Sequence, residues 1–372
     1  MKALAVYPSK KSYAVIGDHP EPKIESASQA KVRILDVGIC GTDKEILQFD
    51  YGTPPEGSDY LVIGHESLGE VVECGAEVRN LKAGDLVVAM VRRPCPHPNC
   101  MACRAGRQDF CYTGDFTERG IKGRHGFMTE FIVDDAMYMN PVPRELRDVA
   151  VLVEPLTIAE KGVTQLWQVQ QRLPWVCPVE PGKKGAYCHK ALVLGAGPVG
   201  LLGAMKMAIE GFETFVYSKS QAADEREKIV NAIGAKFIHA ETTSVADAAK
   251  QIGGIDVVYE AVGASRLAFE VLEQLDSNGV FIMTGVPGRK GPVEVDTDLI
   301  MRNYVLKNQM LYGTVNANKE SFEDAIRDLG EFVKRWPEAV RNIISNRFPI
   351  ERATEPLGGS AGGIKNVIAV AQ

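Results

Sequence analysis

Several features that define other classes of protein are missing from this 372-residue sequence. Its formal net charge is −6, so it lacks the basic excess that nucleic-acid-binding surfaces need. No apolar run approaches the length of a membrane-spanning helix, and the opening residues Met1–Val6 resemble a β-strand more than a signal peptide. There is also no internal repeat and no low-complexity tract. We therefore expect neither nucleic acid nor membrane as a partner, and we expect a cytoplasmic protein.

The length and the change of texture along the chain predict two domains. Before about residue 90, short strands such as Ala3–Tyr7, Ala30–Val37 and Leu68–Glu73 are separated by Gly and Pro, which is typical of an antiparallel barrel. From about residue 190, strands alternate with helices, which predicts a doubly wound parallel sheet. The expected strands there are 191–194, Thr214–Tyr217, Asp256–Tyr259 and Val280–Met283. The expected helices are Leu201–Glu210, Ala222–Ile233, Val245–Gln251 and Arg266–Leu275.

Three further segments complete this outline. We expect an amphipathic helix at Ala325–Lys334 and a closing strand at 363–371. Residues Leu173–Gly185 contain three prolines and two glycines, so we expect a surface loop there, before the first strand of the parallel sheet.

A glycine-rich turn follows the apolar run Ala191–Leu194, in the order Gly195-x-Gly197-x-x-Gly200. A strand that enters a helix through this turn is the context in which the pattern binds a dinucleotide. Gly195 would allow the tight turn, Gly197 would leave room for a pyrophosphate, and Gly200 would let strand and helix pack closely. Pro198 and Val199, between the last two glycines, would begin the helix whose N-terminus faces the phosphates.

The second strand of the parallel sheet indicates which dinucleotide is preferred. NAD enzymes normally place a carboxylate at its end, about 20 residues after the glycines, to hold the ribose 2′-hydroxyl. Here Thr214–Tyr217 is followed by Ser218, Lys219 and Ser220, and no carboxylate occurs before Asp224. Hydroxyl and ammonium groups would donate to a 2′-phosphate, so the sequence favours NADP. Because Lys is a point charge and not a fork, we expect the preference to be incomplete and NAD also to be used.

Four of the eight cysteines are clustered in the order Cys95-x4-Cys100-x2-Cys103-x7-Cys111. In a sequence without a secretion signal, such clustering favours metal binding over disulfides. Four soft ligands at short spacing predict a closed tetrahedral zinc site with a structural role. His97 is an alternative to Cys95 as the first ligand, although an all-sulfur set is the preferred interpretation.

Residues that would suit a second, open metal site are scattered through the first 160 positions. Cys40 lies in Gly-Ile-Cys-Gly-Thr-Asp, His65 and Glu66 are adjacent, and Glu154 precedes Pro155. One thiolate, one imidazole and one carboxylate with a free position would form a catalytic zinc site. Their spacing alone does not establish that they meet.

The segment Gly64-His65-Glu66-x2-Gly69-x5-Gly75-x2-Val78 matches the zinc-site signature of the zinc-dependent medium-chain alcohol dehydrogenases. The Cys40 segment, the cysteine lobe and the glycine turn follow in the order that this family has them, so the resemblance covers nearly the whole chain. Within the family the sequence most resembles the archaeal-type glucose dehydrogenases. This likeness rests on 91–94, 118–121, 126–128, 154–156, Glu160-Lys161 and 314–316.

The resemblance implies a fold and a domain arrangement. The fold would be α/β, with a GroES-like β-barrel catalytic domain and a Rossmann doubly wound parallel-sheet nucleotide domain. The catalytic domain would comprise 1–157 and 308–372, with the zinc lobe near 93–115, and the nucleotide domain would comprise 158–307. The family also implies a homodimer or homotetramer. The sequence departs from the family pattern at two places. The first gap of the cysteine lobe has four residues where the family usually has two, and the insertion around 173–186 is longer than in ordinary alcohol dehydrogenases.

The resemblance further implies two zinc ions per chain and a set of site residues. Cys40, His65 and Glu154 would hold the catalytic zinc, with Glu66 as an exchangeable ligand or a close neighbour, and Thr42 would carry the hydroxyl proton toward solvent. Glu118 and Asn316 would hold sugar hydroxyls, together with Glu154. Further cofactor contacts would come from Thr284, Gly285, Val286, Thr314, Val315, Asn316 and Lys365.

The predicted activity is transfer of hydride from C1 of an aldose, glucose first and galactose next, to NADP or NAD, giving the lactone. Two alternatives remain open. One is a polyol, threonine or secondary-alcohol dehydrogenase of the same family, and the other is a catalytically silent nucleotide-binding protein.

Overall fold

The computed structural model describes residues 1–183, 185–219, 224–288, 291–359 and 361–371, which form two compact units. The first unit comprises Met1–Thr157, Asn316–Val333 and Ile344–Gln372, and the second comprises Ile158–Val315 and Lys334–Ile343. Because contacts alone define these units, the catalytic and nucleotide roles of the two parts remain predictions. Within the described ranges, no helix is both long and apolar enough to cross a membrane.

The first unit is built on one large sheet and two small ones. The large sheet has the strand order β11 (Met139–Val142), β6 (Leu86–Ala89), β5 (Glu66–Cys74), β3 (Gln29–Gly38), β19 (Lys365–Ala369) and β18 (Ile344–Pro349), and β10 (Phe131–Asp135) also pairs with β3. The small sheets are β2 (Ser12–Ile16), β1 (Ala3–Tyr7) and β4 (Leu61–Val62), and β7 (Arg92–Arg93), β8 (Thr117–Arg119) and β9 (Gly123–Arg124). Its helices are α1 (Gly41–Leu47), α2 (Met101–Arg104), α9 (Lys319–Arg335) and α11 (Thr354–Leu357).

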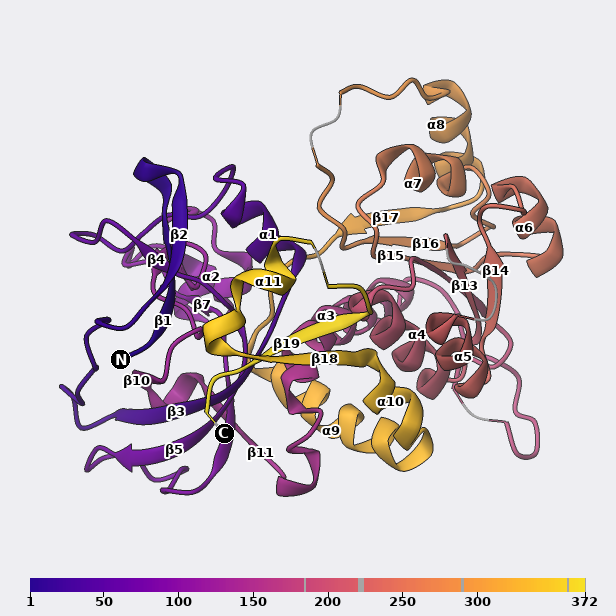
Figure 1. Ribbon diagram of the computed structural model, residues 1–372. Helices are drawn as coiled ribbons and strands as arrows, with labels where there is room; N and C mark the ends of the chain where they lie inside the picture. Colours follow the sequence, from indigo (N-terminus) through magenta and orange to yellow (C-terminus); the bar gives the residue numbers. More distant parts are fainter. Residues whose placement is uncertain (184, 220–223, 289–290, 360, 372) are drawn as a thin grey trace. The chain divides into compact units, whose positions relative to one another are not determined.

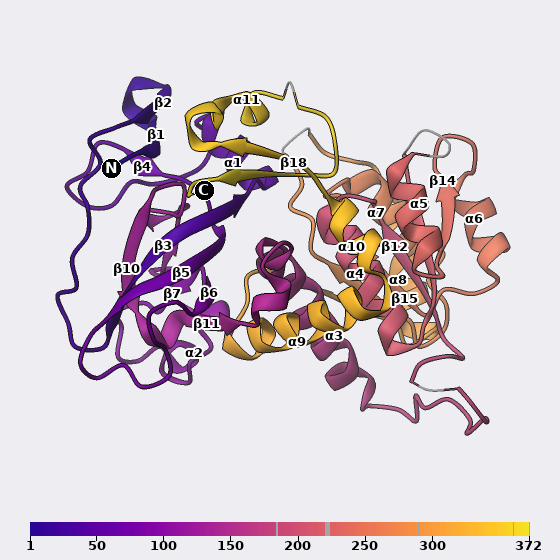
Figure 2. The ribbon, with the colours of Figure 1, turned by 60° about the horizontal axis from the view of Figure 1, so that its bottom comes forward.

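Strand β3 is the centre of the large sheet. Its first half alternates between buried and partly exposed residues, with Ala30, Val32 and Ile34 in the core. Strands β5 and β10 run antiparallel to it, and the C-terminal strand β19 runs antiparallel to its last residues, as Figures 1 and 2 show. The last strand of the chain therefore lies beside one of the first.

The second unit contains a six-stranded sheet in which every neighbouring pair is parallel. Its strand order is β14 (Lys236–His239), β13 (Glu213–Ser218), β12 (Lys190–Leu194), β15 (Val257–Glu260), β16 (Val280–Met283) and β17 (Met310–Gly313). The helices associated with it are α3 (Val153–Gln170), α4 (Pro198–Glu210), α5 (Glu225–Ala232), α6 (Val245–Ile252), α7 (Ser265–Leu272), α8 (Thr297–Leu306) and α10 (Pro337–Ile343). The order reverses beside β12, so the glycine turn after β12 lies at the switch point where such sheets bind ligands.

Side chains of alternating direction cover both faces of this sheet. Leu192 and Leu194 of β12 join one apolar cluster with residues of α6 and α7. Figure 1 shows α7 and α8 on one face and α4 on the other. The predicted doubly wound parallel sheet is confirmed.

The sequence predicted the middles of elements better than their ends. Helix α5 begins at Glu225, because the Asp224 carboxylate accepts hydrogen bonds from two amides of the first turn. The first two residues of the predicted helix, 222 and 223, lie outside the described residues. Helix α9 begins at Lys319, six residues earlier than predicted. The sequence reading did not anticipate α3, whose Pro155 occupies the first turn, where proline is tolerated.

The loop after α3 contains a feature that the cysteine pattern did not predict. Cys177 and Cys188 form a disulfide across 11 residues, with Cys177 inside the expected loop Leu173–Gly185 and Cys188 three residues after its end. The preference for metal binding over disulfides does not apply to this pair.

Candidate functional site

Three of the four proposed catalytic zinc residues, Cys40, His65 and Glu66, converge at one end of the large sheet of the first unit. Cys40 is the residue before α1, His65 directly precedes β5, and Glu66 is the first residue of β5. The candidate ligand atoms of these three residues all lie within 4.8 Å of one another. His65 and Glu66 are buried and Cys40 is partly exposed, so this group of one thiol, one imidazole and one carboxylate is open on the side of the cysteine.

Asp43 connects the two segments that carry Cys40 and His65. Its side chain is fully buried, and its two oxygens accept hydrogen bonds from the amides of Cys40 (2.9 Å) and Gly64 (3.2 Å). One oxygen also lies 3.5 Å from Nδ1 of His65. The Cys-Gly-Thr-Asp motif contains Asp43, but the sequence analysis assigned it no role.

The protonation of His65 reflects these neighbours. Burial alone would lower its pKa, but the charge of Asp43 and contacts with Asp43 and Cys40 raise the pKa well above its ordinary value. Nδ1 of His65 is buried and, among the residues that the structure describes, has no hydrogen-bond partner. A cation among the three ligands would satisfy the same electrostatic demand that otherwise holds a proton there.

The side chain of Glu66 lies against Gly38 of the neighbouring strand and contacts the buried Lys365. In the sheet register, Gly38 of β3 is opposite Glu66 on one side and Val367 of β19 on the other. A Cβ atom at Gly38 would lie 2.1 Å from Oε2 of Glu66, so only glycine leaves room for this carboxylate. Glu66 forms an ion pair with Lys365, whose Nζ also donates to the Ile39 carbonyl at 3.0 Å. Lys365 was predicted as a cofactor contact, but its side chain is buried beside the metal cluster.

Two other predicted residues lie near this cluster without belonging to it. Glu154 is in the first turn of α3, and its carboxyl oxygens are not within the 4.8 Å group. Burial raises the pKa of Glu154 to about 7, while His65 and Lys365 oppose the rise and Glu66 adds to it. The hydroxyl of Thr42 lies 4.0 Å from Sγ of Cys40. Direct zinc ligation by Glu154 and proton transfer by Thr42 remain predictions.

The two predicted sugar-binding residues contact each other. Nδ2 of Asn316 donates to Oε1 of Glu118 at 2.9 Å, and the guanidinium of Arg92 binds the same oxygen at 3.0 Å. Asn316 has a left-handed backbone (φ 60°), a conformation that asparagine tolerates better than most residues. Arg92 lies over the ring of Phe116 at 3.6 Å. The sequence analysis assigned no role to Arg92, which together with Asn316 fixes the carboxylate.

The charges of both Glu118 and His65 act on the phenol of Tyr51. Burial raises the pKa of the phenol, the charge of Glu118 adds to the rise, and His65 opposes it. The phenol is therefore within electrostatic reach of both Glu118 and His65. Its side chain is about half exposed, which makes it a further candidate for substrate contact that sequence reasoning missed.

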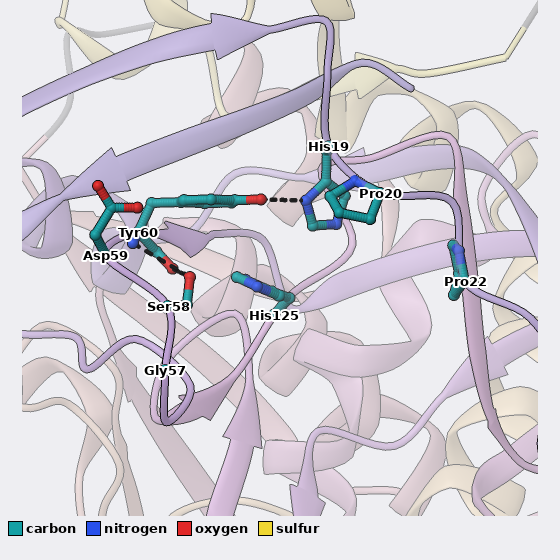
Figure 3. A pocket seen from close by; sticks show the side chains of 8 residues that line it. All are labelled: His19, Pro20, Pro22, Gly57, Ser58, Asp59, Tyr60 and His125. Atoms are coloured by element: carbon teal, nitrogen blue, oxygen red, sulfur yellow. Dashed lines mark hydrogen bonds between the residues drawn. The ribbon is translucent and has the colours of Figure 1, made fainter.

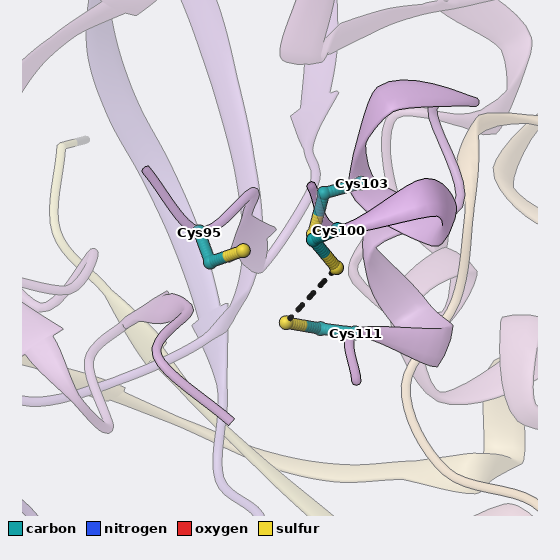
Figure 4. Close-up of side chains that lie close together, drawn as sticks. All are labelled: Cys95, Cys100, Cys103 and Cys111. Carbon is teal, nitrogen blue, oxygen red and sulfur yellow. Dashed lines mark hydrogen bonds between the residues drawn. The ribbon is translucent and has the colours of Figure 1, made fainter. Parts of the chain in front are cut away.

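Figure 4 shows the four cysteines of the lobe close together, with Cys100 just before α2 and Cys103 within it. Their sulfur atoms all lie within 4.8 Å of one another. Cys95 contributes the fourth sulfur, whereas Nε2 of His97 lies 2.7 Å from an oxygen of Asp115. Burial raises the pKa of the Cys103 thiol to about 12. For Cys111, burial is outweighed by contacts with Thr113, which lower its pKa to about 6. The geometry favours Cys95 over His97, and four thiols this close need a cation to be ionised together.

The glycine turn of the second unit has the geometry that a dinucleotide needs. Gly195 has φ +95°, which side chains rarely adopt. A Cβ at Gly200 would lie 2.0 Å from the Gly195 carbonyl oxygen, so only glycine lets the helix pack this closely against the turn. At Gly197 nothing lies within 4 Å of a Cβ, which leaves the space in front of α4 open. Helix α4 begins with Pro198 and Val199 and turns its N-terminus to this space.

Ser218 is the last residue of β13, beside the glycine turn, and Lys219 follows it. Oγ of Ser218 accepts a hydrogen bond from the amide of Ala196 at 3.2 Å, and Lys219 is exposed. Ser220, which was predicted with them, lies outside the described residues.

The later predicted cofactor residues follow β16 and β17. Glu260, at the end of β15, accepts hydrogen bonds from the amides of Val262, Gly263 and Gly285. The hydroxyl of Thr284 donates to the carbonyl of Glu260 at 2.7 Å. Val286 and Val315 are exposed, and the buried hydroxyl of Thr314 has no hydrogen-bond partner in the described part of the chain. Glu260, which sequence reasoning missed, organises the loops at this edge of the sheet.

A separate cavity of about 470 Å³ in the first unit contains none of the predicted site residues. Its lining, drawn in Figure 3, consists of His19, Pro20, Pro22, Gly57, Ser58, Asp59, Tyr60 and His125. Nδ1 of His19 lies 2.8 Å from the Tyr60 hydroxyl, and the rings of Tyr60 and His125 are stacked at 5.1 Å. Nδ1 of His125 accepts a hydrogen bond from the amide of Val62 at 3.1 Å.

We expect His125 to make the fold sensitive to mild acid. Burial, with further repulsion from His19 and Arg119, lowers its pKa to about 4. Because an unfolded histidine has a pKa of about 6.5, the unfolded state binds the proton first. The free energy of unfolding should therefore fall as pH drops from about 6.5 to about 4, by roughly 1–2 kcal/mol after allowance for partial exposure.

Urea unfolding at pH 7 and at pH 4.5 measures this loss. His125→Asn should lose less stability between the two values than the wild type, whereas His97→Asn, a change at an exposed histidine, should lose as much. Equal losses in wild type and His125→Asn would contradict the assignment.

A GroES-like β-rich unit with two metal-ligand clusters and a Rossmann-type unit with a dinucleotide turn together define a medium-chain dehydrogenase. Comparisons with known proteins agree. The family profile "Alcohol dehydrogenase GroES-like domain" matches residues 26–144, and "Glucose dehydrogenase C-terminus" matches residues 147–370. The chain belongs to the glucose dehydrogenase family of the medium-chain alcohol dehydrogenases, as the sequence motifs predicted.

Relatives match along their whole length. The chain is 39% identical to a glucose 1-dehydrogenase of Methanocella arvoryzae, covering 100% of this chain and 99% of the relative. It is 37% identical to that of Thermoproteus tenax, with the same coverage. Among solved structures, the glucose dehydrogenase of Haloferax mediterranei in complex with NADP, Zn and gluconolactone matches with a TM-score of 0.87 and 30% identity, covering 100% of both chains.

Proposed function

We propose that this protein is a zinc-dependent glucose 1-dehydrogenase that prefers NADP and also uses NAD. The reaction takes hydride from C1 of an aldose, glucose or galactose, to the nicotinamide and leaves the lactone. The observation that carries the proposal is the convergence of Cys40, His65 and Glu66 in a chain that matches glucose dehydrogenases over its full length.

The donor set fits zinc. Thiolate, imidazole and carboxylate are the ligands that zinc takes in catalytic sites, and the sulfur of Cys40, a ring nitrogen of His65 and a carboxylate oxygen of Glu66 lie within 4.8 Å of one another. Zinc held there supplies a Lewis acid that favours ionisation of the anomeric hydroxyl. The second ion of the proposal, held by Cys95, Cys100, Cys103 and Cys111, would have all four positions occupied by protein and would stabilise the lobe.

This chain's own residues would position the sugar and move its proton. Glu118, held by Arg92 and Asn316, offers a buried carboxylate to sugar hydroxyls, and a substrate without those hydroxyls would leave it unpaired. The hydroxyl of Thr42, close to Cys40, would take the proton from the anomeric hydroxyl toward solvent. The raised pKa of Glu154 keeps its carboxyl group partly protonated near neutral pH, so it would accept or donate a hydrogen bond beside the anomeric hydroxyl.

Lys219 supports the choice of NADP. It is exposed at the end of β13, next to Ser218, which is held against the glycine turn. A 2′-phosphate on the ribose of the cofactor would gain a charge-assisted hydrogen bond from the ammonium group.

We therefore expect Lys219→Ala to lower kcat/KM for NADP by about tenfold or more, because a charged hydrogen bond contributes roughly 1.5–3 kcal/mol. The value for NAD should change little. Steady-state kinetics with both cofactors measure the ratio, and Lys228→Ala, a change at an exposed lysine of α5, is the matched control. If the ratio of kcat/KM for NADP to that for NAD is unchanged in Lys219→Ala, Lys219 does not bind the 2′-phosphate.

A panel of aldoses, polyols, threonine and secondary alcohols tests the substrate class. Turnover of glucose or galactose with NADP, and loss of turnover after chelation, is the expected result. Preferential turnover of polyols, threonine or simple alcohols would favour the other family activity. No turnover of any compound, despite cofactor binding, would favour a silent nucleotide-binding protein.

The cytoplasmic location and a homodimer or homotetramer are also part of this proposal, and the family resemblance supports the oligomer. Light scattering on the purified chain tests the second point, and a monomer at micromolar concentration would contradict it.

A further inference from the structure

The loop between α3 and β12 ends in a cluster that the proposed reaction does not use. The disulfide between Cys177 and Cys188 closes this loop, and His189 directly follows it. A ring nitrogen of His189 and the two sulfur atoms all lie within 4.8 Å of one another. Trp175, two residues before Cys177, is buried and stacks on the imidazole of His189, with ring centres 4.1 Å apart.

The surroundings of His189 resemble those of a metal-binding histidine. Its Nδ1 lies 3.6 Å from one oxygen of Asp256, and the other oxygen of Asp256 accepts a hydrogen bond from the amide of Lys190 at 2.8 Å. Its Nε2 is buried and has no hydrogen-bond partner among the described residues. A carboxylate beside one ring nitrogen commonly orients a histidine whose other nitrogen binds a metal.

We propose that Cys177, Cys188 and His189 form a redox-gated site for a soft divalent cation such as zinc. The site is closed while the disulfide is intact, since disulfide sulfurs are not thiolate ligands. A dithiol reductant opens it, because two electrons and two protons convert the disulfide to two thiols while the reductant becomes a disulfide. The incoming cation then displaces the two thiol protons and gains two thiolates and the imidazole.

Both states of this site would connect the same parts of the chain. The disulfide joins residues 177 and 188, and the cation would join 177 to 188 and 189. Since Cys188 is exposed, a reductant can reach the bond, and disulfides of cytoplasmic proteins are usually reduced. His189 precedes β12, the strand that leads to the glycine turn, so either link would hold the loop to the start of the central strand of the sheet.

Metal counting on the full-length protein tests this proposal. Wild type and the double variant Cys177→Ser/Cys188→Ser are reduced, freed of reductant under argon and dialysed against zinc chloride. Elemental analysis should then give one more zinc ion per chain in the reduced wild type than in the double variant. Oxidised wild type should match the double variant. Since only the difference is read, the result does not depend on whether the two sites of the proposed function are filled. Equal zinc contents in reduced wild type and the double variant would overturn the proposal.

Two further variants separate the metal site from a simple disulfide. His189→Gln keeps both cysteines, so it should still form the disulfide but should lose the additional zinc ion after reduction. Cys74→Ser, which removes a free thiol of the first unit, should keep it. Melting temperatures give a second readout, since zinc should raise the Tm of reduced wild type more than that of His189→Gln. An identical response of the two to zinc would exclude His189 as a ligand and contradict the proposed site.

Discussion

Cys40→Ala is expected to lower kcat/KM for glucose by about 10³-fold or more. Removing one of three ligands should empty the catalytic zinc site, and a Lewis acid contributes several kcal/mol to the transition state, with 1.36 kcal/mol per factor of ten. Sγ of Cys40 lies within 4.8 Å of the ligand atoms of His65 and Glu66. Steady-state kinetics and a zinc count should show loss of activity together with loss of one ion per chain.

Cys74→Ala is the matched control, because Cys74 is a partly buried free cysteine at the far end of β5 from Glu66 and is in neither metal cluster. It should keep its activity and its zinc. The Tm of Cys40→Ala establishes that the loss of activity is not a loss of fold. If folded Cys40→Ala retains full zinc and near-normal kcat/KM, the open zinc site is not formed by this cysteine.

Lys365→Met is expected to lower the free energy of unfolding by about 3–5 kcal/mol, the usual result when one partner of a buried ion pair is removed. Lys365 and Glu66 are both almost fully buried, and the ammonium group of Lys365 also donates to the Ile39 carbonyl. Without the ammonium group, Glu66 would remain as a buried charge without its counterion. Denaturant unfolding of chelator-treated protein measures the effect without compensation by a bound cation.

The double variant Lys365→Met/Glu66→Gln provides the internal check. It removes both charges at once, so it should be more stable than Lys365→Met alone, although Glu66→Gln is expected to impair catalysis. A double variant that is no more stable than Lys365→Met would mean that lost packing, and not an unpaired charge, causes the instability.

The elements that sequence reasoning identified are those whose signals are local. The glycine turn depends on backbone conformation at Gly195 and close packing at Gly200, both within one turn of the chain. The cysteine lobe likewise joins residues that are at most 16 positions apart, from Cys95 to Cys111, so their spacing alone indicated that they bind one metal ion. The strands and helices of the parallel sheet followed from hydrophobic runs of the right length, although their ends depended on caps such as Asp224.

The remaining features needed the register of the sheets. Lys365 reaches Ile39 across 326 positions because β19 pairs with β3, and Gly38 leaves room for the carboxylate of Glu66. Asn316 meets Glu118 across 198 positions. The sequence suggested a cofactor contact for Lys365 and could not indicate that Arg92, Asp43 or Glu260 would organise the sites.

By itself, then, the sequence determined the chemistry that is available: a dinucleotide turn with a lysine at the next strand, four clustered thiols, and a cysteine, a histidine and two glutamates of the family pattern. Tertiary structure alone decided which of these groups meet. It brought Glu66 rather than Glu154 into the tight group with Cys40 and His65. It also placed the Cys177–Cys188 disulfide beside His189, whose Nε2 has no hydrogen-bond partner among the described residues. The physical reason is that side chains far apart in sequence are brought together by strand pairing and packing, which no local spacing records.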